Sequence, residues 1–221
     1  MSQRESGYQR KPLDQYETPP WVTRVLIPHL PEFIGKIWEP ACGSGKMVAA
    51  LRQVGFDVVG SDITQGVDFL GQAPETGVGA IITNPPYALA QEFIERALHF
   101  DDTRIVAMLL RTDFDHAARR AHLFADCAMF DKRVVLTKRI QWFEESNGSP
   151  SFNHCWMIWD RQHRGPPILG SILLCSTTTI SMPPVENVVF VSKFRTPISR
   201  MPRLGENEPG RQGTLQHNAD S

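Results

Sequence analysis

Short apolar segments alternate with amphipathic segments from residue 37 to residue 124 of this chain. Four segments are short and largely apolar, as buried strands are: 37–41, 57–63, 79–83 and 104–110. Three others carry apolar residues at helical spacing: 45–54, 88–100 and 114–124. This order of strands and helices predicts an α/β fold, in which a mostly parallel sheet has helices on both faces.

The pattern changes after residue 130. Segments 133–143 and 154–159 are typical of strands, and the turn-rich segment 144–150 between them predicts an antiparallel hairpin. Both ends of the chain are polar, and the last stretch is rich in Gly, Pro and Asn. We therefore expect a polar tail at 1–13, one α/β domain at 14–164 and a partly disordered C-terminal extension at 165–221.

Composition excludes several classes of protein. The net charge is −1, so any surface for nucleic acid must be a local patch. One candidate is segment 104–139, where eight basic and four acidic residues give +4, although a solvated face with internal pairs such as Asp115 with Arg119 explains it equally well. The sequence contains neither an apolar run of membrane-spanning length nor an N-terminal signal peptide, which predicts a cytoplasmic protein with no membrane partner.

The cysteines predict neither disulfides nor a zinc site. The chain has 4 cysteines, and none of them forms a C-x-x-C pair. His154 and Cys155 are adjacent, but without a second pair of ligands nearby they are typical of a buried strand. We expect no metal in this protein.

A glycine-rich turn follows the first predicted strand, with the sequence Glu39-Pro40-Ala41-Cys42-Gly43-Ser44-Gly45. It is not a phosphate-binding P-loop, which needs Gly at 40 and Ser or Thr at 47, where this chain has Pro and Met. A dinucleotide fingerprint fails because position 48 is Val. Asp62 ends the next strand and could accept both ribose hydroxyls of a nucleoside cofactor. A tight turn with a solvated carboxylate remains the alternative.

A second turn, Asn84-Pro85-Pro86-Tyr87, follows the strand at 79–83. Consecutive prolines end a strand and rigidify the backbone. The Asn84 side-chain oxygen and the Pro85 carbonyl are two acceptors that suit the two hydrogens of an NH₂ group, and Tyr87 can stack on a planar heterocycle. The alternative is an ordinary turn. Since ligand sites of open α/β sheets lie at the carboxyl ends of strands, both turns should open on the same edge.

Together the two turns resemble those of class I S-adenosylmethionine-dependent methyltransferases, and more narrowly those of phage-type N6-adenine DNA methyltransferases with an Asn-Pro-Pro-Tyr motif. The resemblance covers about residues 14–160 and implies a Rossmann-like, mostly parallel seven-stranded sheet that ends in an antiparallel hairpin. It implies that Asn84, Pro85, Pro86 and Tyr87 are catalytic. It also implies a set of residues that bind S-adenosylmethionine: Tyr16, Thr18, Pro19, Glu39, Pro40, Ala41, Cys42, Gly43, Gly45, Asp62, Ile63, Asp68, Phe69 and Asn84.

The activity implied by the resemblance is transfer of a methyl group from S-adenosylmethionine to the N6 amino group of an adenine flipped out of duplex DNA. The enzyme is expected to act as a monomer. Only a short C-terminal segment follows, where such enzymes have a target-recognition region. Two other functions stay open: methylation of an RNA adenine or a protein glutamine amide, and a catalytically silent protein that binds S-adenosylmethionine.

Overall fold

The computed structural model of the protein describes residues 16–142 and 152–172. Backbone contacts divide the chain into two units, 1–177 and 178–221, and all the described residues belong to the first. The expected tail at 1–13 and the turn-rich segment at 144–150 lie outside the described residues, as does the extension beyond residue 172.

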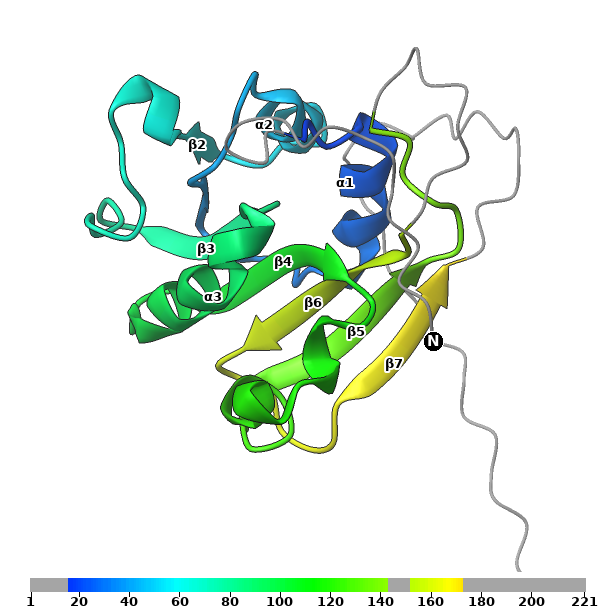
Figure 1. Ribbon diagram of the computed structural model, residues 1–221. Helices are drawn as coiled ribbons and strands as arrows, with labels where there is room; N and C mark the ends of the chain where they lie inside the picture. The colour runs from blue at the N-terminus through cyan, green and yellow to red at the C-terminus, as the bar shows by residue number, and fades with distance from the viewer. Residues whose placement is uncertain (1–15, 143–151, 173–221) are drawn as a thin grey trace, which may run out of the picture. The chain divides into compact units, whose positions relative to one another are not determined.

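A mixed sheet is the centre of the described part of the chain (Figure 1). Its seven strands lie in the order β2-β1-β3-β4-β6-β5-β7. Six of them overlap segments that the sequence predicts as strands: β1 (Lys36–Glu39), β2 (Val58–Gly60), β3 (Val78–Thr83), β4 (Ile105–Arg111), β5 (Phe130–Leu136) and β6 (His154–Asp160). The strand expected at 133–143 begins earlier and ends at Leu136, so residues 137–142 are not part of it. β1, β2, β3 and β4 pair in parallel, whereas β6 is antiparallel to both β4 and β5. The expected mostly parallel sheet with an antiparallel pair is therefore confirmed.

The seventh strand, β7 (Ile168–Ile172), pairs in parallel with β5. The sequence pattern predicts no structure for this segment and an α/β domain that ends at residue 164. The sheet continues past that point, so the antiparallel pair β5–β6 is not its last element.

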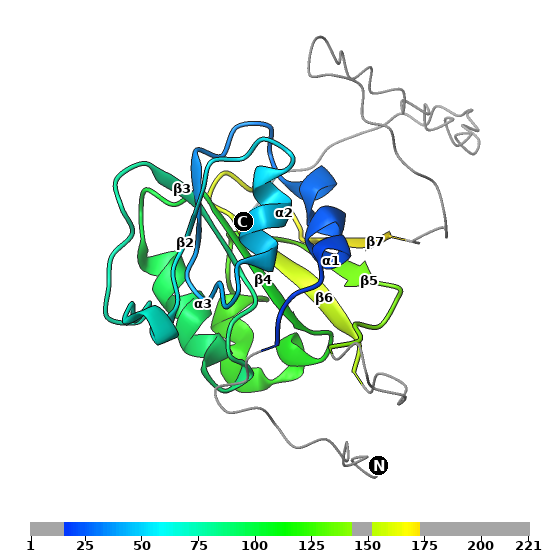
Figure 2. The same ribbon diagram turned by 90° about the horizontal axis from the view of Figure 1, so that it is seen from above.

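Helices cover both faces of the sheet (Figure 2). On one face, α1 (Pro20–Leu26) and α2 (Lys46–Arg52) bury Val22, Leu26, Met47 and Leu51 against the strands. On the other, α3 (Ala90–His99) buries Phe93, Ile94 and Ala97 in a second apolar cluster. Because both faces are covered, the central strands β4 and β6 are buried along almost their whole length.

One predicted helix is different in the structure. Segment 114–124 forms two short 3₁₀ helices, η5 (Phe114–His116) and η6 (Ala118–Leu123), separated by Ala117 in an extended conformation. Three further 3₁₀ turns are present in the described residues: η2 (Ile27–His29), η3 (Ile63–Gln65) and η4 (Tyr87–Leu89). Side-chain bonds account for the break: Arg120 donates to the Phe114 carbonyl, and Arg133 binds Asp115 from β5. These tertiary bonds outweigh the local helical preference.

The strand order locates the site. β1 lies between β2 and β3. The connection from β1 leads to β2 on one side of it, and the chain then crosses back to form β3 on the other side. Such a switch point opens a crevice at the carboxyl ends of the two strands that flank it. The glycine-rich turn follows β1 and the Asn84 turn follows β3, so both lie at this crevice.

Candidate functional site

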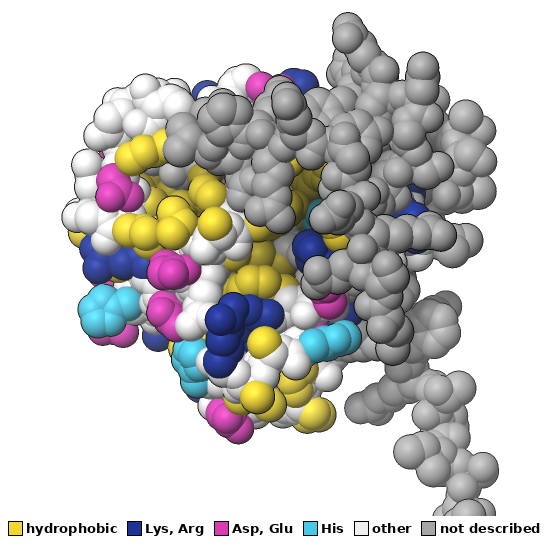
Figure 3. All heavy atoms as spheres, in the orientation of Figure 1, with side chains coloured by type: hydrophobic (Ala, Val, Ile, Leu, Met, Phe, Trp, Pro, Cys, Tyr) yellow, Lys and Arg dark blue, Asp and Glu magenta, His cyan; other side chains and the backbone are white. Residues whose placement is uncertain are grey.

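A cavity of about 850 Å³ lies at the carboxyl ends of β1 and β3. It is lined by many of the predicted site residues: Tyr16, Thr18, Glu39, Pro40, Ala41, Cys42, Gly43, Asp62, Ile63, Asp68, Phe69, Asn84 and Pro86. Four predicted residues are not part of the lining: Pro19, Gly45, Pro85 and Tyr87. In Figure 3 hydrophobic side chains gather over the region of β3. The exposed Ile63 and Leu89 belong to the lining of the cavity.

Further lining residues were missed by the sequence analysis: Glu17, Ser44, Lys46, Met47, Thr64, Val67, Leu70, Ala88, Leu89 and Phe93. Most are direct neighbours of predicted residues. Leu89 and Phe93 come from the helical segment after Tyr87, where positions four apart share one face. The helical spacing of the apolar residues in α3, continued backward to the Asn84 turn, would have predicted both residues on the face toward the cavity.

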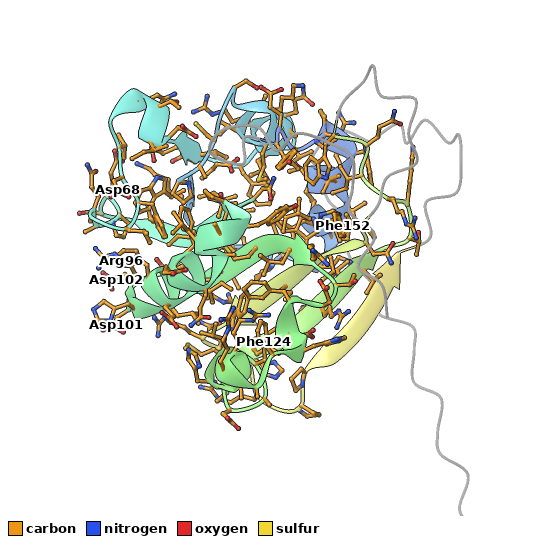
Figure 4. The ribbon with its side chains drawn as sticks, in the orientation of Figure 1. Asp68, Arg96, Asp101, Asp102, Phe124 and Phe152 are labelled. Carbon is orange, nitrogen blue, oxygen red and sulfur yellow. The ribbon has the colours of Figure 1, made fainter. Side chains whose placement is uncertain are left out.

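The turn between β1 and α2 is held by the backbone and by Asp62. Gly43 and Gly45 have positive φ, at 51° and 83°, and Gly45 is the N-cap of α2. Asp62 accepts the Gly43 amide at 2.9 Å through one carboxylate oxygen and binds the Thr64 amide and hydroxyl through the other. Burial favours a raised pKa for Asp62, but these hydrogen bonds outweigh it and lower the pKa. Asp62 therefore stays ionised, and it ties the turn to the end of β2. Asp68, labelled in Figure 4, lies on the loop that follows η3.

Glu39 is the last residue of β1 and lines the cavity. It is buried, with 1% of its surface exposed. Its Oε1 accepts the Thr83 hydroxyl at 3.1 Å. Burial raises the pKa of Glu39 to about 8, although the Thr83 hydroxyl and the Asn84 backbone oppose the rise; the Asp62 charge adds to it. Glu39 is therefore mostly protonated at neutral pH.

This protonation predicts a pH-dependent stability. Glu39 loses its proton near pH 4.5 in the unfolded chain but only near pH 8 in the folded protein. The contribution of Glu39 to the free energy of unfolding is therefore fully present below about pH 4.5 and is lost as the pH rises to about 8. We expect Glu39→Gln, which keeps an acceptor for Thr83, to remove this loss. The variant should gain stability over wild type as the pH rises from about 5 to about 8. Urea unfolding of both proteins across this range measures the difference, and a difference that stays constant with pH would contradict it.

Asn84 directly follows β3 and is half-buried. Its Nδ2 donates to the backbone carbonyl of Tyr16 at 3.0 Å. Because a carbonyl can only accept, this bond fixes the orientation of the amide and places Oδ1 on the other side. Oδ1 is buried and has no hydrogen-bond partner among the described residues. A buried acceptor without a partner costs stability, so this atom is a candidate ligand-binding group.

The other residues of this turn have different positions. Pro85 is buried, Pro86 lines the cavity, and Tyr87 begins η4. The Tyr87 hydroxyl lies 2.9 Å from Nε2 of His154, the first residue of β6. The Tyr87 ring is nearly parallel to that of Tyr16, at 25° with centroids 6.3 Å apart. Tyr87 thus contacts the rings of both Tyr16 and His154 beside the cavity.

The sequence also singled out the basic segment 104–139 and the adjacent residues His154 and Cys155, and the structure shows the contacts of both. In segment 104–139, four basic residues form ion pairs: Arg104–Asp160, Arg111–Asp113, Lys132–Asp131 and Arg133–Asp115. Three of these pairs join residues of the same segment and so leave its net charge of +4 unchanged, and Asp115 pairs with Arg133 rather than with Arg119. His154 and Cys155 are both buried in β6.

None of the helices in the described residues combines the length and apolar character needed to cross a membrane. Nor do three or more His, Cys, Asp and Glu side chains of the described residues cluster in a way that could hold a metal ion.

Comparison with solved structures shows the fold. A protein from Listeria monocytogenes assigned to the class I S-adenosylmethionine-dependent methyltransferases matches with a TM-score of 0.50 and 14% identity, over 69% of this chain and 63% of that one. This chain therefore spans less than two thirds of the Listeria protein. A protein from Pyrococcus horikoshii assigned as an RNA methyltransferase matches with a TM-score of 0.50 and 15% identity, over 67% of this chain and 87% of that one. No protein-family model and no curated protein matches the sequence. The chain has the Rossmann-like fold of class I methyltransferases.

Proposed function

We propose that this chain transfers a methyl group from S-adenosylmethionine to the N6 amino group of an adenine that has left the DNA duplex. The observation that carries the proposal is the buried and unpartnered Oδ1 of Asn84 at the cavity, with its amide fixed by the Tyr16 carbonyl. An oriented acceptor at the carboxyl end of a strand suits a substrate that brings an N–H donor.

The volume and the lining of the cavity support S-adenosylmethionine as the cofactor. Its volume is about 850 Å³, its wall includes apolar Ile63, Phe69 and Leu89, and two carboxyl groups, of Glu39 and Asp62, face it. When bound, S-adenosylmethionine supplies a methyl group activated by a sulfonium. Asp62 and the turn at Gly43 would hold the nucleoside part, and Ile63 would contact its base.

The chemistry of the acceptor explains the need for Asn84. An exocyclic amino nitrogen is a weak nucleophile because its lone pair is delocalised into the ring. Asn84 Oδ1 would accept one N–H, which localises the lone pair and stabilises the positive charge that develops during attack. As the bond from nitrogen to the methyl carbon forms, the bond from that carbon to sulfur breaks and S-adenosylhomocysteine leaves, and the extra proton on the nitrogen is released to solvent. An adenine inside a duplex cannot reach such a cavity, so the base must leave the stack, and Tyr87 would stack on it.

The experiment that tests the proposal is a transfer assay with S-adenosylmethionine labelled on its methyl group. The purified full chain is incubated separately with unmethylated DNA, RNA and protein, and digested products are separated by mass. We expect label in N6-methyladenine from DNA. Label found only in RNA or in a glutamine amide would reject the DNA substrate and keep the chemistry. Cofactor binding without transfer to any of the three would reject the enzyme.

A further inference from the structure

We propose that His154 is a positioning residue for this reaction: its bond to the Tyr87 hydroxyl holds the Tyr87 ring in the orientation in which it stacks on the target base. The inference rests on the proposed function, because it assigns His154 a role through Tyr87 rather than a contact with the substrate. It goes beyond the sequence analysis, in which His154 was only a buried strand residue.

The strand register brings His154 to the site. β6 runs antiparallel to β4, and His154, its first residue, lies opposite Arg111, the last residue of β4. The amino end of β6 therefore shares an edge of the sheet with the carboxyl ends of β3 and β4. Phe152, which precedes β6, lies near the end of β4 in Figure 4, and its ring packs 4.0 Å from the Arg111 guanidinium.

The two rings meet end to end. The Tyr87 hydroxyl is 2.9 Å from His154 Nε2, while the ring centroids are 6.0 Å apart at an angle of 24°. With such a short bond and such distant centroids, the imidazole lies beyond the hydroxyl end of the phenol and not over the centre of its face. His154 therefore restrains the tilt of Tyr87 without occupying the surface on which a base would stack.

His154 is itself held firmly. It is 2% exposed, and the Trp142 ring meets it edge-on, with centroids 5.3 Å apart at 85°. Burial lowers the pKa of His154 to about 4, and the nearby Arg111 adds to this effect. The imidazole is therefore neutral at physiological pH. A buried neutral imidazole needs a hydrogen bond to offset its lost hydration, and the Tyr87 hydroxyl provides one.

A double-mutant cycle tests the proposal, with His154→Phe and Tyr87→Phe as the single variants. Each removes the bond and keeps a ring. We expect each to lower kcat/KM for methyl transfer to DNA about tenfold, with cofactor Kd unchanged, and the double variant to be no worse than either single one. His154→Gln, which can still hydrogen-bond to the hydroxyl, should recover most of the activity.

Three outcomes would overturn the role of His154. The first is wild-type activity in Tyr87→Phe, the second is losses that multiply in the double variant, and the third is no recovery with glutamine. If His154→Phe fails to fold, Tyr87→Phe and His154→Gln still decide, because one leaves His154 in place and the other keeps a polar partner. A wild-type protein that transfers nothing to adenine would reject the proposed function and this role with it. Any of the three outcomes above, in a wild-type protein that does transfer methyl groups to adenine, would reject the role alone.

Discussion

Replacing Asn84 with alanine is expected to slow methyl transfer about 100- to 1,000-fold while cofactor Kd changes by only a few fold. The substitution removes Oδ1, the unpartnered acceptor at the cavity, and so leaves the amino group of the substrate with its lone pair delocalised. It also removes the bond from Nδ2 to the Tyr16 carbonyl. Because Tyr16 lines the same cavity, this second loss accounts for the small change in cofactor binding. Single-turnover rates at saturating cofactor, together with a direct binding assay, separate the two effects.

Asn84→Asp is the matched control for this prediction. It keeps an oxygen acceptor toward the cavity, but the second oxygen cannot donate to the Tyr16 carbonyl. We expect it to transfer methyl groups faster than Asn84→Ala and more slowly than wild type. An alanine variant that works at the wild-type rate would remove Asn84 from the chemistry, whereas a variant that no longer binds the cofactor would make its main role structural.

The sequence was sufficient to bring the two turns together. The glycine-rich turn and the Asn84 turn each follow a short apolar strand, and parallel strands carry their carboxyl ends to one edge. That rule requires only the order of strands and helices, which the apolar pattern between residues 37 and 110 supplies. The cavity at the ends of β1 and β3 is the physical consequence.

The contacts that depend on distant pairing could not be predicted. The bond between Tyr87 and His154 joins residues 67 positions apart and exists only because of the register between β4 and β6. Likewise, β7 is stabilised by parallel pairing with β5, and the Pro166-Pro167 sequence before it gives the opposite local signal. Local propensity contains no information on such pairings, since the partner strand determines them.

The carboxylate of Asp62 shows an intermediate case. The sequence predicted an acid at the end of a strand that could accept ribose hydroxyls. In the structure the same carboxylate also accepts the Gly43 amide, so it orders the turn that would hold the cofactor. A spacing of 19 residues between Gly43 and Asp62 indicates that the two lie on adjacent strand ends, but only coordinates reveal the bond.

Gly79→Ala is expected to destabilise the protein by about 3 kcal/mol, because among the described glycines Gly79 has the closest approach to neighbouring atoms. A Cβ on Gly79 would lie 1.9 Å from the carbonyl oxygen of Ile34 and 2.8 Å from its carbon. Both are backbone atoms, so no side-chain rotation relieves the clash. The Gly79 carbonyl also accepts the Arg104 amide at 2.9 Å, which restrains β3 from shifting away. Urea unfolding of variant and wild type measures the loss.

The same change at Gly71 is the control. A Cβ there would meet only Asp68, at 3.7 Å or more. The φ of Gly71 is not positive, so a residue with a side chain can adopt its backbone conformation without strain. Gly71→Ala should therefore stay within about 0.5 kcal/mol of wild type. Since Gly79 lies on the strand that leads to Asn84, its alanine variant should also lose methyl transfer through displacement of β3, which Gly71→Ala should not. Equal stability of the two variants would mean that the segment at Ile34 can move away from β3 at little cost. The position of the strand that leads to the Asn84 turn would then not depend on this close backbone contact.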